Sequence, residues 1–197
     1  YAELVKEQLP EIGANQILQE PSRKNTAPCV AYASYKIKTL NPDATLIVAP
    51  SDHIVMSENS FKSTMDVAIK QSGSENCLVT LGIKPSRPDT GYGYIQFLDN
   101  VEGSPEDVRE VKMFTEKPNF ELAQQFIESG DFYWNSGIFI WSVDSIIEAF
   151  SKFLPSMHDA FSEGMKVYNT DLEQEFINHT YAECKNISID YGIMEKA

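Results

Sequence analysis

The spacing of apolar residues alternates along the chain between the period of a helix and the continuous runs that are typical of buried strands. Helical spacing, bounded by capping residues and by Pro or Gly, predicts helices at residues 2–9, 26–40, about 61–69, 120–128 and 144–153, with a mostly helical remainder. Runs rich in Val, Ile and Leu predict strands at residues 16–18, 45–49, 77–83, 93–98, 108–116 and 137–143. Strands and helices that alternate in this way are typical of an α/β protein.

The two most apolar strands determine the predicted form of the sheet. Residues 45–49 and 77–83 carry few polar positions, as do strands that are buried on both faces of a parallel sheet. Residues 93–98 and 108–116 are separated only by an acidic loop, which indicates one antiparallel excursion. Asn25 or Thr26 and Asp144 are expected to cap the helices that follow them. We therefore predict one α/β domain over residues 1–197, with a mostly parallel central sheet and helices on both faces.

The composition excludes several classes of partner. With 197 residues, of which 42% are hydrophobic, the chain is long enough to bury a sizeable core. A net charge of -13 argues against binding to nucleic acid or to an anionic membrane surface, and no apolar run approaches the ~20 residues of a membrane span. The three cysteines, Cys29, Cys77 and Cys184, form no CxxC pair and indicate reduced thiols in a cytoplasmic protein.

Asp52 follows the strand at residues 45–49 directly. Ligands of open α/β sheets bind at the carboxyl ends of the strands, so this carboxylate is well placed to hold a divalent metal. A carboxylate oxygen suits Mg²⁺, which commonly takes substrate phosphates as further ligands. The alternative is a helix-capping aspartate in an ordinary turn.

The segment at residues 20–28 offers groups that suit a nucleotide. The predicted helix start exposes backbone N–H groups and the positive end of the helix dipole, and Arg23 and Lys24 add positive charge. Glu20 could accept paired hydrogen bonds from the N1–H and amino groups of guanine, a pattern that adenine lacks. The alternative is a capped helix with exposed charges.

A carboxylate, an ammonium group and an amide are expected at strand ends further along the chain. Glu116 and Lys117 stand directly before Pro118, which stops the strand, and Asn119 can cap the next helix. In that position Lys117 would meet a phosphate and Glu116 would accept from sugar hydroxyls. The alternative is a solvated surface pair.

Four more positions belong to the predicted sugar-phosphate side. Asn135 can both donate and accept, and Gly137 leaves room beside it. Gly93 allows close approach of the backbone to a ligand, although Gly-x-Gly also occurs in plain turns. Asp190 lies in a late acidic segment that could face the ligand or simply begin a helix. For Asn135, the alternative is an ordinary turn residue before a strand.

Read in order, six segments resemble the mannose-1-phosphate guanylyltransferase family: EPSRKNTAP, LIVAPSDHIV, LGIKPSRPDTGYGYIQ, FTEKPN, FYWNSGIFIW and SIDYGIMEKA. The resemblance implies a Rossmann-like nucleotidyltransferase fold. It also implies that GTP and mannose 1-phosphate give GDP-mannose and pyrophosphate with Mg²⁺. The family's glycine-rich loop, G-G-x-G-x-R, and its C-terminal region have no counterpart here. We therefore expect a central fragment of the enzyme, inactive on its own.

The resemblance assigns a role to each candidate residue. Asp52 would be the magnesium ligand and, with Lys117, a catalytic residue. The nucleotide would be bound by Glu20, Arg23, Asn25, Thr26 and Ala27, and the sugar phosphate by Gly93, Glu116, Lys117, Asn135, Gly137 and Asp190. A homodimer is among the possible assemblies. Two alternatives stay open: a nucleotidyltransferase for another sugar or base, and a regulator that binds a nucleotide sugar without turnover.

Overall fold

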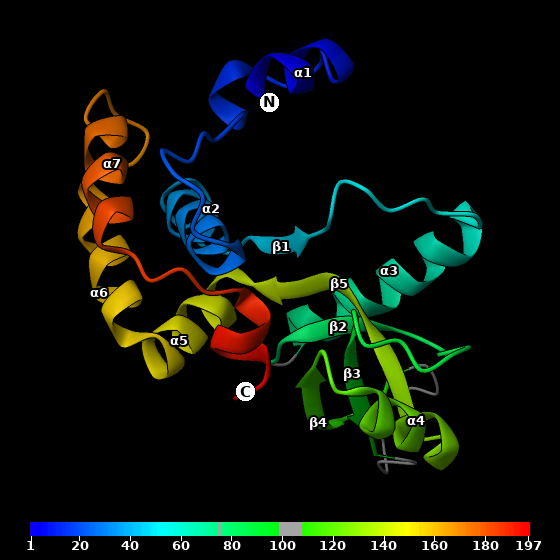
Figure 1. Ribbon diagram of the computed structural model, residues 1–197. Coiled ribbons are helices and arrows are strands. Elements are labelled where there is room, and N and C mark those ends of the chain that lie inside the picture. The colour runs from blue at the N-terminus through cyan, green and yellow to red at the C-terminus, as the bar shows by residue number, and fades with distance from the viewer. Residues whose placement is uncertain (75, 99–107) are drawn as a thin grey trace.

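The computed structural model describes residues 1–74, 76–98 and 108–197 (Figure 1). The helices are α1 (Ala2–Gln8), α2 (Thr26–Leu40), α3 (Glu58–Ser74), α4 (Phe120–Ser129), α5 (Val143–Phe153), α6 (Pro155–Ser162) and α7 (Glu173–Glu183), with the short turns η1 (Ala14–Gln16), η2 (Glu163–Lys166) and η3 (Asp190–Met194). The strands are β1 (Thr45–Val48), β2 (Val79–Ile83), β3 (Gly93–Phe97), β4 (Val111–Glu116) and β5 (Phe132–Ser142). In this part of the chain no helix is long and apolar enough to cross a membrane.

β5 is the central strand, and every strand pairing in the described sheet is antiparallel. At Phe139, β5 pairs with Val48 of β1 on one side and with Thr80 of β2 on the other. β1 and β2 therefore run in the same direction, as two strands joined by a helix should, but β5 lies between them in the opposite direction. The prediction of a mostly parallel sheet is wrong, because long-range pairing with β5 was not visible in the local pattern.

The apolar run at β1 is less buried than predicted. Leu46 is buried, but Ile47 is 50% exposed, and β5 is the partner with which β1 pairs among the described strands. An apolar strand with a covered face and an exposed face does not fit the expectation of burial on both sides.

Local predictions differ from the structure at three further points. Residues 16–18 are not a strand, because η1 occupies Ala14–Gln16. Ser142 caps α5, with its hydroxyl accepting the Ser145 N–H at 3.0 Å, whereas Asp144 forms an ion pair with Lys38. β5 begins at Phe132, five residues before the predicted start. The acidic loop between β3 and β4 falls largely outside the described residues.

Helices cover both faces of β5, as predicted. Phe139 and Trp141 point into the largest apolar cluster, which includes residues of α2, α5, α6 and α7. Ile138 and Ile140 point the other way, against Met65 and its neighbours on α3. Alternate residues of a strand face opposite sides, so one strand joins two layers of helices. A separate cluster packs α4 against β3 and the start of β5.

A buried ion pair ties α2 to α7. Lys36 Nζ lies 2.6 Å from Glu173 Oε2, and both side chains are almost fully enclosed. Glu173 also accepts from the Tyr32 hydroxyl and from the Asn169 backbone N–H. Burial alone would raise the pKa of Glu173, but the hydrogen bonds from Lys36 and Tyr32 outweigh it, so the pKa is lowered. The carboxylate is thus held in its charged form.

We expect Glu173→Ala to lower the free energy of unfolding by about 3 kcal/mol, because it leaves a buried ammonium without its partner. Urea denaturation followed by circular dichroism measures the change. Asp144→Ala is the matched control: it breaks another ion pair made by α2, with Lys38, but Asp144 is exposed, so the loss should not exceed about 1 kcal/mol. Equal losses in the two variants would contradict the structural role of Glu173.

Candidate active site

Asn135 is held by three hydrogen bonds at the middle of β5. Its amide nitrogen donates to Asp190 Oδ1 at 3.0 Å. Its amide oxygen accepts from the Thr80 hydroxyl at 3.0 Å and from the Gly137 N–H at 3.1 Å. Side chains and backbone from β2, β5 and η3 therefore fix one amide. The predicted residues Asn135, Gly137 and Asp190 lie together, and Thr80 is a member that the sequence did not reveal.

Glu116 and Lys117 reach the same place from the end of β4. Glu116 pairs across the sheet with Gly93 of β3. A methyl group at Gly93 would collide with the Glu116 carboxylate and come within 3.3 Å of the Asn135 Cβ, so any side chain there would require the carboxylate to move. Lys117 Nζ lies 3.4 Å from Glu116 Oε1. The predicted sugar-phosphate residues are thus neighbours in space, although 97 positions separate Gly93 from Asp190.

Glu195 is a further member of this group. Its Oε1 accepts the backbone N–H of Glu116 at 2.9 Å, so the segment after α7 holds the end of β4. The turn η3, which joins Asp190 to Glu195, has the wide π-helical form, a rare turn that often occurs at functional sites. The sequence predicts no role for Glu195, because its contact with β4 depends on tertiary packing.

Carboxylates outnumber cations in the group. Burial, and next the nearby Asp190 carboxylate, raise the pKa of Glu116 above its usual value. Burial also raises the pKa of Asp190, despite the hydrogen bond from Asn135. Each negative charge is therefore less stable here than in water. A ligand with hydroxyl groups would supply further donors to these oxygens.

The backbone at Lys117 is strained. Its φ angle is +47°, a left-handed conformation that is uncommon for residues other than glycine. Its N–H donates to the Tyr92 carbonyl at 3.2 Å, which holds this conformation. Strain of this kind clusters at functional sites, where the surrounding structure maintains it. It directs Lys117, whose side chain stays 56% exposed, away from the regular course of the strand.

Asp52 lies in the exposed turn that follows β1. Pro50 of the same turn lies beside Gly137, where an added Cβ would be 3.4 Å from its ring. The turn therefore adjoins the Asn135 group. Among the described residues, no three His, Cys, Asp or Glu side chains gather as a ready-made metal site. One carboxylate still fits Mg²⁺, which commonly combines a single carboxylate with phosphates and water.

The predicted nucleotide residues lie at the start of α2. Asn25 caps the helix, accepting the Thr26 N–H at 3.0 Å. Thr26 Oγ1 accepts the Ile189 N–H at 2.8 Å, and the Ala27 N–H donates to the Ile187 carbonyl at 3.1 Å. The first two N–H groups of the helix are thus engaged within the chain, which the sequence did not predict.

Glu20 and Arg23, the charged residues of the predicted nucleotide side, contact different parts of the chain. Glu20 Oε1 accepts a hydrogen bond from the Tyr181 hydroxyl at 3.0 Å. Arg23 lies over the ring of Tyr1 at 5.9 Å and is not part of that contact. Ile187 and Ile189, which bond to Ala27 and Thr26, directly precede Asp190 in the chain. One short stretch of chain therefore contacts both the nucleotide side and the Asn135 group.

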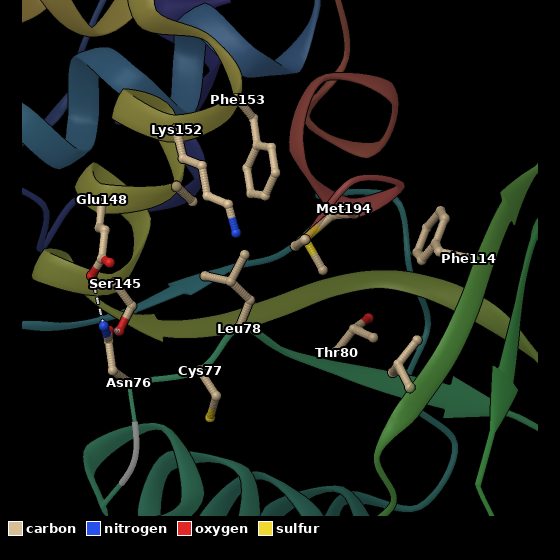
Figure 2. A pocket seen from close by; sticks show the side chains of 13 residues that line it. Asn76, Cys77, Leu78, Thr80, Phe114, Ser145, Glu148, Lys152, Phe153 and Met194 are labelled. Carbon is tan, nitrogen blue, oxygen red and sulfur yellow. Dashed lines mark hydrogen bonds between the residues drawn. The ribbon is translucent and has the colours of Figure 1, made fainter.

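A pocket of about 330 Å³ lies beside this site (Figure 2). Thr80 is common to both, and Lys152 points its ammonium group into the pocket in the view of Figure 2. Asn135, Glu116 and Lys117 are not among the residues that line it. The side chains that suit a sugar phosphate therefore lie outside the pocket.

The chain belongs to the nucleotidyl transferase family, whose model, described as "Nucleotidyl transferase", matches residues 1–181. It is 38% identical over 201 residues to a mannose-1-phosphate guanylyltransferase of Escherichia coli and 36% identical over 196 residues to the xanthan biosynthesis protein XanB of Xanthomonas campestris. The alignments cover 98% of this chain but only 43% and 41% of those proteins. The chain thus spans about two-fifths of the length of these relatives. The expected resemblance to guanylyltransferases is confirmed.

Solved structures support the same fold. A Thermus thermophilus protein described as mannose-1-phosphate geranyltransferase matches with a TM-score of 0.82 at 31% identity, over 99% of this chain and 53% of that one. A Helicobacter pylori protein described as mannose-6-phosphate isomerase has a TM-score of 0.78 at 24% identity, over 99% of this chain and 73% of that one, and shows the fold alone. The nucleotidyltransferase fold predicted from sequence is confirmed, apart from the direction of its strands.

The raised pKa of Asp190 leads to a pH-dependent prediction. When the pKa of a carboxyl group is higher in the folded than in the unfolded state, the folded protein loses stability as the pH rises from the lower pKa to the higher one. We expect Asp190→Asn to raise the melting temperature by a few degrees at pH 7, and the gain to disappear as the pH falls below about 4, where Asp190 becomes protonated in the unfolded state as well. Thermal denaturation across pH measures this.

The control is Asp66→Asn, which changes an exposed aspartate on α3 and should leave the melting temperature nearly constant. Destabilisation by Asp190→Asn at pH 7 would show that the charge is satisfied in the fold, contrary to our account.

Proposed function

We propose that the full-length protein transfers a guanylyl group from GTP to mannose 1-phosphate, which gives GDP-mannose and pyrophosphate. The observation that carries the proposal is the gathering of Asn135, Asp190, Glu116 and Lys117 around Gly93 in a member of the nucleotidyl transferase family. Similarity to proteins named mannose-1-phosphate guanylyltransferase supports the choice of substrates.

The reaction needs little covalent participation from the protein. A phosphate oxygen of the sugar phosphate attacks the α-phosphorus of GTP in line, a new P–O bond forms, and the bond to pyrophosphate breaks. The nucleophile is already an anion at neutral pH, because the second pKa of such a phosphate is about 6. No general base is required, so catalysis depends on positioning and on charge neutralisation.

The Asn135 group would hold the sugar. Acceptor oxygens of Glu116 and Asp190 suit sugar hydroxyls, and the fixed amide of Asn135 adds direction. Lys117, placed beside Glu116 but largely exposed, would meet the phosphate as a point charge. Gly93 makes room for the Glu116 carboxylate, and Gly137, which has no side chain, would let the sugar ring approach the backbone.

The electrostatic cost of the reaction is large in so acidic a chain. Two unit charges 4 Å apart repel by about 4 kcal/mol at an effective dielectric of 20. The ammonium of Lys117 offsets part of this repulsion. Asp52 would hold Mg²⁺, which supplies further positive charge to the phosphates when bound.

The start of α2 would take the nucleotide. The Glu20 carboxylate suits the N1–H and amino groups of guanine, and the positive end of the helix dipole favours phosphate. Arg23, which is close in sequence, would add positive charge, and Asn25, Thr26 and Ala27 would line the nucleotide beside it. We propose a cytoplasmic enzyme, in which a homodimer is one possible assembly.

The first test is pyrophosphate release from GTP, mannose 1-phosphate and Mg²⁺ by the full-length gene product and by the 197-residue chain. We expect activity in the full-length product alone. Activity with other nucleotides or sugar 1-phosphates, but not with GTP and mannose 1-phosphate, would identify a nucleotidyltransferase with different substrates. Tight binding of GDP-mannose without any turnover would instead favour a regulator and contradict the proposal.

Lys117→Ala in the full-length protein should reduce kcat by roughly 100-fold or more, since it removes a charge that positions the attacking sugar phosphate and neutralises its repulsion with GTP. Its Kd for GTP should change less than about threefold, because the side chain contacts the other substrate. The control is Lys112→Ala near the other end of the same strand, where the side chain is exposed. Equal losses of turnover and GTP binding in Lys117→Ala would exclude its assigned role.

A further inference from the structure

Tyr181 reaches Glu20 from the opposite end of the chain. It lies on α7, is fully buried, and donates its hydroxyl to Glu20 Oε1 at 3.0 Å. Glu20 itself is exposed, on the segment that precedes α2. The hydroxyl of a buried residue thus restrains the side chain of an exposed one.

The tyrosine is itself firmly placed. Its ring meets Phe161 of α6 edge to face, with 5.9 Å between the centroids. Burial, and next the charge of Glu20, raise the pKa of Tyr181 far above its usual value, so the phenol stays a hydrogen-bond donor. A donor whose ring is packed in this way can fix the direction of the group that accepts from it.

The backbone beside Glu20 is also restrained. The Ile187 N–H donates to the Lys24 carbonyl at 3.3 Å. Thr26 and Ala27 contact the same segment, at Ile189 and Ile187. These bonds hold the backbone near Glu20 but leave its side chain free to rotate. The Tyr181 hydroxyl supplies the missing restraint, and Oε1 keeps a second lone pair for another donor.

We propose that Tyr181 is a positioning residue that determines base specificity, because it orients the Glu20 carboxylate toward the N1–H and amino groups of guanine. The inference rests on the proposed function, in which Glu20 reads the base. Tyr181 does not touch the nucleotide itself. It fixes the plane of the carboxylate before the base arrives, so that less entropy is lost on binding.

Inosine triphosphate tests this role, because its base keeps the N1–H of guanine but lacks the amino group. The measurement is kcat/KM for GTP and for ITP, with mannose 1-phosphate, in the full-length protein. Tyr181→Phe removes only the hydroxyl. We expect the preference for GTP over ITP to fall by roughly tenfold, about the effect of one hydrogen bond to a charged group.

Two controls separate positioning from a general loss of structure. Tyr168→Phe removes another buried hydroxyl, which donates to the Phe161 carbonyl at 2.9 Å and not to Glu20, so it should leave the ratio unchanged. The single change Glu20→Gln should abolish the preference for GTP over ITP. Adding Tyr181→Phe to Glu20→Gln should then have no further effect on the ratio, because the tyrosine acts through the carboxylate.

The outcomes distinguish the two proposals. If the protein forms GDP-mannose and prefers GTP, an unchanged ratio in Tyr181→Phe, or effects that add to those of Glu20→Gln, would overturn the role of Tyr181 alone. Formation of GDP-mannose without any preference for GTP over ITP would also overturn it. No formation of GDP-mannose by the full-length protein would overturn both.

Discussion

The pairing of β5 with three other strands is the constraint on which the rest of the chain depends. Its C-terminal half separates β1 from β2, and its N-terminal half pairs with β3. The same strand carries apolar side chains into two layers of helices and places Asn135 between Thr80 and Asp190. Core and site therefore share one element, and any shift of its register would misplace both.

The site beside β5 carries more negative than positive charge. Two carboxylates with raised pKa values stand beside one another, and a third, Glu195, holds the backbone of β4. Such a group is unfavourable for an anion and favourable for hydroxyl groups. Lys117, on a strained turn at the edge of these oxygens, places a positive charge beside the acidic group.

Local features were predictable from the sequence, and distant pairings were not. Asn25 and Asn119 cap α2 and α4 through bonds to residues at most three positions away, so the sequence suffices to predict them. The partners of Phe139 lie 59 and 91 positions away, and nothing in an apolar run specifies them. The site residues were predicted as separate motifs. Their contacts with Thr80 and Glu195 follow only from the folded sheet.

The segment from Ile187 to Glu195 contacts both halves of the site, through Thr26 on one side and through Asn135 and Glu116 on the other. Two sets of contacts on one short stretch limit how such a protein can diverge. In the proposed reaction, a change there that favours a new sugar would also move the start of α2. For that reaction, the choice of sugar and the choice of base are therefore expected to change together in evolution through this segment, and separately only through residues outside it.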